Sequence, residues 1–76
     1  MYRFLVIFEK GAENYGAHAP DLPGCVAVGD ILEEVEKNMR EAIEMHIQGM
    51  LEDNEPIPTS QFTARYMDVT MPDSVA

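Results

Sequence analysis

A chain of 76 residues has room for one domain with a small hydrophobic core, and its single cysteine excludes an internal disulfide. Fourteen acidic side chains against five basic ones give a net charge of −9, which argues against direct nucleic-acid binding because phosphate contacts need clustered Lys and Arg. A core this small is usually stabilised by association when no disulfide or metal is available. We therefore expect a homo-oligomer, a dimer or larger, with no cofactor and no metal.

The amino-terminal segment predicts a β-strand over residues 2–9, because aromatic and β-branched residues dominate it. Its apolar side chains fall on both faces, a pattern typical of a central strand that is covered on both sides. One helix covers only one face of a small sheet, so we expect the second face to meet another subunit or a partner. The apolar side chains of the two faces are Phe4, Val6 and Phe8 on one and Leu5 and Ile7 on the other.

The same apolar run is too short to be the core of a signal peptide and far too short to span a bilayer. We therefore expect a cytoplasmic protein, without membrane contact, in which Cys25 is reduced.

Two further strands are predicted over residues 15–19 and 25–28, with a Pro-Asp-Leu-Pro-Gly turn between them. Pro23 fixes φ for the second position of a β-turn, and Gly24 supplies the positive φ that a type II turn needs next. The segment 10–14 is the expected hairpin loop between the first two strands.

After Asp30 the apolar residues recur at three- and four-residue steps, which predicts an amphipathic helix of about 22 residues. Asp30 is the expected N-cap, with Glu33 placed to complete a capping box. The helix is expected to end near Asp53, because Pro56 and a second proline prevent it from resuming.

A final strand is predicted over residues 63–69, so the element order is β-β-β-α-β. Three antiparallel strands followed by a helical crossover place the last strand parallel to the first. The fold class is therefore α+β, with one long covering helix. We expect one domain over residues 1–70 and a carboxyl-terminal tail over 71–76.

Residues with catalytic potential are few and scattered. His46 lies on the apolar stripe of the helix, where a packed or interface histidine is more common than a catalytic base. We expect Cys25 to be a small buried residue. A metal-dependent hydrolase of RNase H type would use Glu9, Asp68 and a helix glutamate, and this is the alternative enzymatic interpretation. The central part of the first strand has no carboxylate, so we expect no enzyme.

The turn between the second and third strands offers a preorganised edge for a partner, since two prolines restrict it. We expect the turn to expose its leucine. The candidate partner-binding residues are Tyr15, His18, Asp21, Leu22 and Pro23.

Residues 2–58 resemble the amino-terminal domain of the HicB family of antitoxins, also described as the UPF0150 group. The resemblance depends on the order and spacing of several short motifs. These are the opening strand, Tyr15-Gly16-Ala17, Pro20-Asp21-Leu22-Pro23-Gly24-Cys25, Gly29-Asp30, Glu33-Glu34 and Asn38-Met39-Arg40-Glu41-Ala42-Ile43.

The resemblance implies a partial RNase H-like fold without the nuclease carboxylates. It also implies that the chain neutralises, by occlusion, a small HicA-type toxin that cleaves mRNA with a catalytic histidine. An RNA-binding toxin is expected to be basic, which fits the charge of −9. Typical members have Thr or Ser where Ile31 stands, and complete antitoxins carry a carboxyl-terminal DNA-binding domain. Because few residues follow the last predicted strand, we expect no operator binding by this chain. An orphan oligomeric domain is the other alternative.

Overall fold

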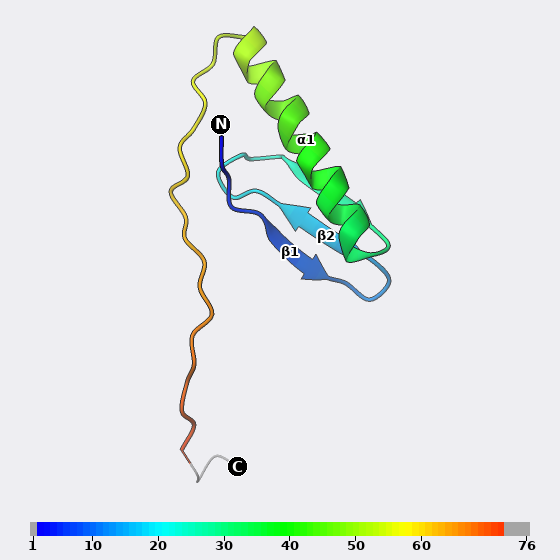
Figure 1. Cartoon of the computed structure of the whole chain (residues 1–76), viewed down its shortest axis with the longest axis vertical. Helices are drawn as coiled ribbons and strands as arrows, with labels where there is room; N and C mark the ends of the chain where they lie inside the picture. Colours follow the sequence, from blue (N-terminus) through cyan, green and yellow to red (C-terminus); the bar gives the residue numbers. More distant parts are fainter. Residues whose placement is uncertain (1, 73–76) are drawn as a thin grey trace.

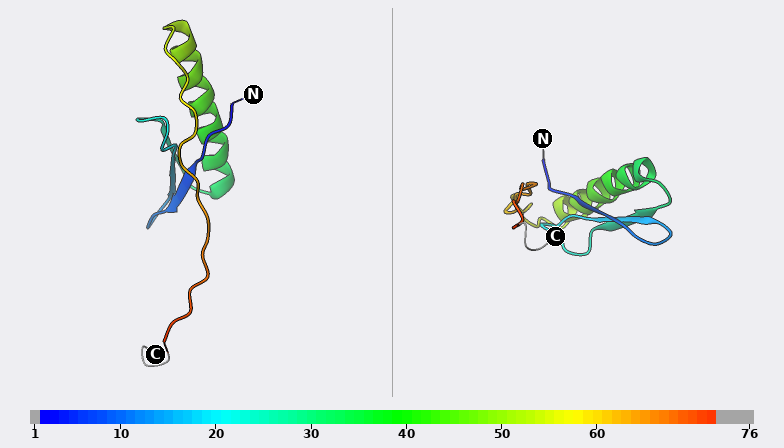
Figure 2. Two further views of the ribbon diagram at one scale, coloured as in Figure 1. Left: turned by 90° about the vertical axis from the view of Figure 1, so that its left-hand side faces the viewer. Right: turned by 90° about the horizontal axis from the view of Figure 1, so that it is seen from below.

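The computed structural model describes residues 2–72, which contain a three-stranded antiparallel sheet and one long helix. The strands are β1 (Ile7–Lys10), β2 (Tyr15–His18) and β3 (Val26–Gly29), in the spatial order β1-β2-β3, and the helix is α1 (Leu32–Glu52). Figure 1 shows α1 lying across the sheet, and Figure 2 shows that the helix covers one face only. The α+β class, with three antiparallel strands followed by a long helix, is confirmed.

The first strand is shorter than the predicted range 2–9. Its pairing with β2 ends at Ile7, opposite His18, because the neighbouring chain then turns away into the segment 19–25. Residues 2–6 precede the strand without regular secondary structure, and the side chains of Phe4 and Val6 pack against the core.

The predicted fourth strand is not seen. Residues 63–69 are extended, but within residues 2–72 they pair with no strand. β1 is consequently an edge strand rather than the expected central strand, and β2 is central. Of the predicted tail at 71–76, residues 73–76 lie outside the described residues.

The core lies between α1 and the covered face of the sheet. Alternate residues of β2 point towards the helix, as the two-residue period of a strand requires. The turn after β2 and one stripe of α1 supply the rest of the core. The buried apolar residues are Ala17, Ala19, Leu22, Cys25, Val35, Met39 and Ile47.

The start of α1 differs from the capping-box prediction. The N-cap position falls on Ile31, whose φ of −128° and ψ of 159° are extended, and no side chain caps the helix there. Asp30 lies one residue too early to act as the cap. Its backbone N–H donates to Glu34 Oε1 at 3.3 Å, so a glutamate reaches back from the first turn instead.

Ile31→Thr is expected to raise the free energy of unfolding by about 0.5–2 kcal/mol, because a hydroxyl at the N-cap accepts a backbone N–H of the first turn. Glu34 stands three residues later, the spacing of a capping box. The isoleucine is 55% exposed, so its removal costs little burial. Urea denaturation followed by circular dichroism measures the change, and Ile31→Ala is the control that removes the isoleucine without adding a cap. Equal stability of the Thr and Ala variants would contradict the assignment of the N-cap.

The end of α1 agrees with the prediction. Asn54 adopts a left-handed φ of 57°, and its N–H bonds to the Leu51 carbonyl at 3.2 Å. Glu55 N–H bonds to the Met50 carbonyl at 2.8 Å. This pair of bonds is the Schellman arrangement that terminates many helices, and Pro56 follows directly.

Candidate protein-binding surface

The segment 19–25 consists of two consecutive β-turns. Leu22 N–H donates to the Ala19 carbonyl at 3.0 Å, and Cys25 N–H donates to the Leu22 carbonyl at 3.0 Å. In each turn the second position is a proline, and in the second turn Gly24 follows with a φ of 83°. The predicted type II turn at Pro23 and Gly24 is confirmed.

The turn buries its leucine instead of exposing it. Leu22 is 1% exposed and belongs to the core cluster, whereas the adjacent Pro23 is exposed. The prediction that the turn exposes Leu22 is therefore wrong. The physical reason is that both turns fold inward at their shared residue, which places this side chain under α1 beside Val35 and Met39 in the same cluster.

Asp21 connects the turn to the segment that follows the helix. Its Oδ1 accepts the backbone N–H of Gln61 at 3.1 Å. Its Oδ2 is buried and has no hydrogen-bond partner within the described residues. The carboxylate thus holds the carboxyl-terminal segment against the turn, and it is only partly available to another molecule.

Tyr15 and His18 do not form one cluster. They lie at opposite ends of β2, three residues apart, and a strand directs side chains at odd and even positions to opposite faces. Tyr15 packs against the core on the helix side. His18 lies on the open face, where its cross-strand neighbours are Ile7 and Val26.

An apolar patch covers the open face of the sheet around His18. Val26 and Val28 are 62% and 63% exposed, and Ile7 is 38% exposed. The alternation of side chains along β3 in the sequence indicates this patch, because Ala27 and Gly29 face the helix and the two valines face the open side of the sheet. We call these four residues, Ile7, His18, Val26 and Val28, the open-face patch.

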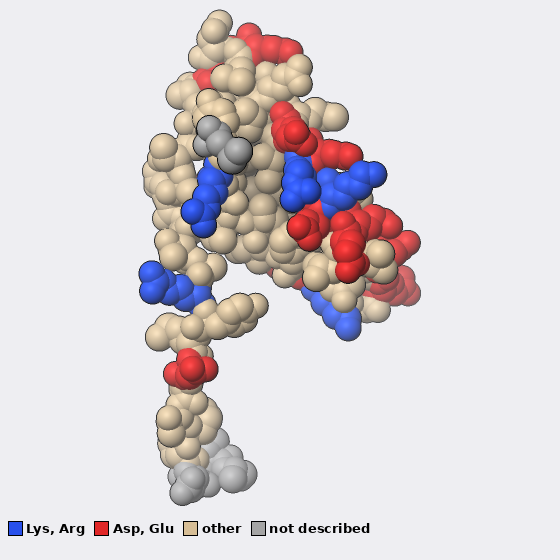
Figure 3. Space-filling view, viewed as in Figure 1, with Lys and Arg blue, Asp and Glu red and all other residues tan. Residues whose placement is uncertain are grey.

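The outward side of α1 is rich in acidic residues. Figure 3 shows carboxylates gathered over the helix, with few basic side chains among them. Arg40 and Glu36 form an ion pair at 3.8 Å, but both side chains are more than half exposed, so the pair contributes little to stability. The negative potential on this side favours the approach of a basic molecule.

Cys25 is buried, as the sequence predicted, and burial raises the pKa of its thiol. A raised pKa means less thiolate at any given pH, and the thiolate is the reactive form. We expect iodoacetamide to alkylate Cys25 at least about tenfold more slowly in the folded chain than in urea, because local opening must first expose the sulfur. Mass spectrometry of quenched samples measures both rates; equal rates would show that the thiol is accessible.

The carboxylates proposed for a hydrolase are not gathered into a metal site. Within residues 2–72, no group of three or more His, Cys, Asp or Glu side chains has an arrangement that could hold a metal ion. Glu9 lies on β1, and Asp68 lies on the unpaired extended segment. Among the described residues, no helix is long and apolar enough to cross a membrane.

Comparison with known proteins identifies the family. The family model described as HicB_like antitoxin of bacterial toxin-antitoxin system matches residues 4–74. A UPF0150 protein of Synechocystis is 31% identical over 70 residues, covering 91% of this chain and 89% of the relative. A protein of 14.9 kDa from the rep-hol intergenic region of Haemophilus phage HP1 is 43% identical over 63 residues, covering 83% of this chain.

A solved structure shares the fold. A chain of the HicA3 and HicB3 toxin-antitoxin complex superimposes with a TM-score of 0.62 at 27% identity, covering 72% of this chain. This chain spans 64% of that solved chain and 47% of the phage relative. The residues that the family model matches, 4–74, include the sheet, the turn and the helix, and the predicted resemblance is confirmed. The chain belongs to the HicB-like antitoxin family of bacterial toxin-antitoxin systems.

Proposed function

We propose that this chain is a non-enzymatic antitoxin module that binds a small basic HicA-type toxin and neutralises it by covering its RNA-binding surface. The observation that supports this most strongly is the structural similarity to a chain of a HicA3 and HicB3 toxin-antitoxin complex. Occlusion needs only binding energy and no metal site, and no group of side chains within residues 2–72 is arranged to hold a metal ion. The encounter would take place in the cytoplasm, where an mRNA-cleaving toxin finds its substrate.

The contact surface that we propose is the open-face patch together with the adjoining turn. An exposed apolar patch on a small domain is a typical binding site, and its sheet face is not covered by the helix (Figure 2). Pro23 and His18 would touch the toxin, whereas Leu22 and Asp21 would hold the turn in shape. Tyr15 packs towards the helix and would contribute indirectly, by fixing the far end of β2.

The acidic side of α1 would act on the rate of association. Opposite charges accelerate encounter, and salt screens this effect over about 8–10 Å. Raising the salt concentration should therefore slow association with the toxin more than it accelerates dissociation.

The experiment uses the basic protein of about 60–80 residues that we expect to be encoded beside this gene, with a double-stranded-RNA-binding pattern. Titration calorimetry should show tight binding. Val28→Lys, which places a positive charge on the open-face patch, should weaken binding at least about tenfold. Met71→Lys is the control, since Met71 is 63% exposed in the carboxyl-terminal segment, outside the proposed contact surface, and it should bind as the wild type does.

Two results would overturn parts of this proposal separately. Unchanged affinity of Val28→Lys would exclude the open-face patch as the contact. Failure of the wild-type chain to bind the neighbouring basic protein would exclude the antitoxin function and leave an orphan domain.

A further inference from the structure

The chain beyond residue 61 forms an extended arm that leaves the body of the protein. Figure 1 shows this arm, residues 62–72, projecting away from the sheet and helix, and Figure 3 shows it separated from the main mass. The radius of gyration is 16.3 Å, whereas a compact domain of this length has about 11 Å. The molecule therefore carries a segment that is not packed on its own domain.

The arm exposes several large apolar side chains to solvent, which is unusual for a segment that is not packed on its own domain. Phe62 is 55% exposed, Tyr66 is 105% exposed, Met67 is 83% exposed and Val69 is 74% exposed. The arm has one basic side chain, Arg65, and one acidic side chain, so it is neutral while the rest of the chain is strongly acidic. A neutral, apolar, extended segment has the composition of a β-strand that pairs with a sheet edge.

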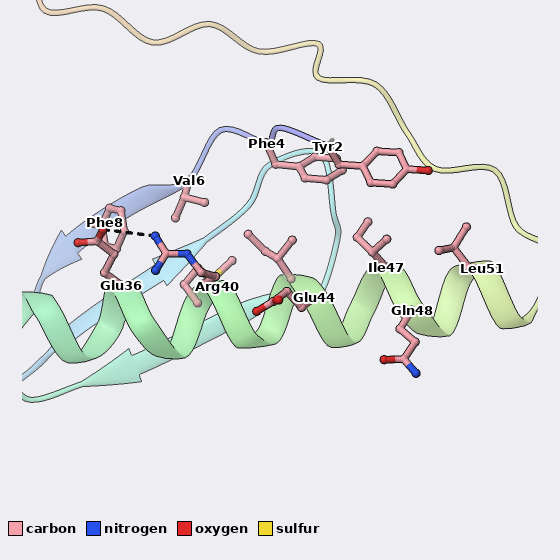
Figure 4. Close-up of a pocket in the computed structure, with 12 residues that line it drawn as sticks. Tyr2, Phe4, Val6, Phe8, Glu36, Arg40, Glu44, Ile47, Gln48 and Leu51 are labelled. Carbon is pink, nitrogen blue, oxygen red and sulfur yellow. Dashed lines mark ion pairs between the residues drawn. The ribbon is translucent and has the colours of Figure 1, made fainter.

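The body has a site with matching properties. β1 is an edge strand, and within the described residues its outer side pairs with no strand. Beside it, between the amino-terminal segment and α1, lies a groove of about 1010 Å³. Figure 4 shows Phe4, Val6 and Phe8 on one wall and Ile47 and Leu51 on the other. Unpaired backbone and an apolar groove therefore lie next to each other.

The arm and the edge are also similar in length. Residues 62–69 span about 26 Å when extended, and residues 2–10 span about 30 Å. Glu36, Arg40 and Glu44 line the groove, and Glu36 is paired with Arg40. Arg65 of an inserted arm would therefore find opposite charge at Glu44. The arm could satisfy the free backbone groups of β1 and bury its own apolar side chains in one step.

The start of the arm is fixed on its own domain, which directs the rest outward. Ile57 packs against the core, and Gln61 N–H is bonded to Asp21. With these anchors in place the following residues run away from the body (Figure 1). Two copies can exchange such arms reciprocally about a twofold axis, and exchange of an identical element is a low-cost route to a dimer.

We propose that two copies of this chain form a dimer by arm exchange, in which residues 62–69 of each copy pair with the β1 edge of the other and fill its groove. The arm of one copy completes the sheet of the other, so each sheet gains the fourth strand that it lacks alone. This exchange leaves the open-face patch free and does not depend on toxin binding, so either proposal can fail without the other.

Size-exclusion chromatography with light scattering tests the dimer. The wild-type chain should have twice the mass of 8.5 kDa. Tyr66→Asp combined with Met67→Asp should raise the dissociation constant of the dimer at least about 100-fold, because each arm loses two apolar contacts. Both residues lie outside the core, so the helix signal in circular dichroism should persist. Val28→Asp on the open-face patch is the control and should remain dimeric.

Cross-linking distinguishes exchange from an arm that folds back on its own domain. One copy carries Lys10→Cys on β1, and a second carries Arg65→Cys on the arm, with a flexible bismaleimide that spans several residues of register. The mixture should give a covalent heterodimer. A chain carrying both cysteines that cross-links only within itself would overturn the proposal, as would a monomeric wild type or a double Asp variant that stays dimeric.

Discussion

Leu22→Ala is expected to lower the free energy of unfolding by about 2–5 kcal/mol, because it removes most of a fully buried side chain and leaves a cavity. Leu22 is 1% exposed and packs in the same cluster as Val35 and Met39. A domain of this size has a total stability of about 4–11 kcal/mol, so this loss is a large share of it. Urea denaturation monitored by circular dichroism measures the change.

The adjacent exposed proline supplies the matched control. Pro23→Ala should cost less than about 1 kcal/mol, since it mainly increases the freedom of the unfolded chain. If Leu22→Ala were as stable as Pro23→Ala, the inward direction of the turn would be wrong. For the same reason Leu22 is a poor probe of partner binding: its alanine variant would lose affinity through unfolding alone.

Gly29→Ala is expected to destabilise the fold by about 1–3 kcal/mol, because the site has no room for a methyl group. A Cβ at this position would lie 2.9 Å from Val35 Cγ2 and 3.1 Å from the Val35 backbone nitrogen. Val35 is fully buried, so it cannot move aside without disturbing the core. The close approach of the end of β3 to the first turn of α1 thus depends on glycine.

Gly49→Ala is the control for this prediction. Apart from the adjacent residues and nearby backbone of its own helix, no heavy atom lies within 4 Å of the position of a Cβ at Gly49. Alanine is also the better helix former by about 1 kcal/mol. The two glycine-to-alanine changes should therefore have opposite signs in thermal denaturation. A neutral or stabilising Gly29→Ala would contradict the observed packing of β3 against the helix.

Local sequence signals predicted the local features well. Pro23 and Gly24 determine their turn through φ alone. The helix ends in a local Schellman arrangement at Asn54, and Pro56 prevents it from resuming, so neither feature depends on distant residues. The N-cap prediction was wrong by one residue. The N-cap is the last residue before the helical conformation begins. Asp30 and Ile31 are adjacent, so a shift of one residue in the start of the helix moves the N-cap from one to the other.

Features that depend on distant contacts were harder to predict. Leu22 is buried because α1 lies over the turn, which its neighbours in the sequence do not reveal. The separation of Tyr15 and His18 was predictable from the two-residue period of a strand, because residues three apart on one strand point to opposite faces of the sheet. A fourth strand needs a sheet edge to pair with, and the residues of 63–69 cannot specify whether that edge lies in their own chain or in another.

The measurement that most directly tests the central claim is a titration of RNA cleavage by the neighbouring basic protein with this chain. We expect cleavage to fall to background when the two are present in stoichiometric amounts, in buffers with and without added divalent metal. This chain alone should leave the RNA intact. Undiminished cleavage at a large excess of this chain would contradict the proposal that it acts as an antitoxin by occlusion.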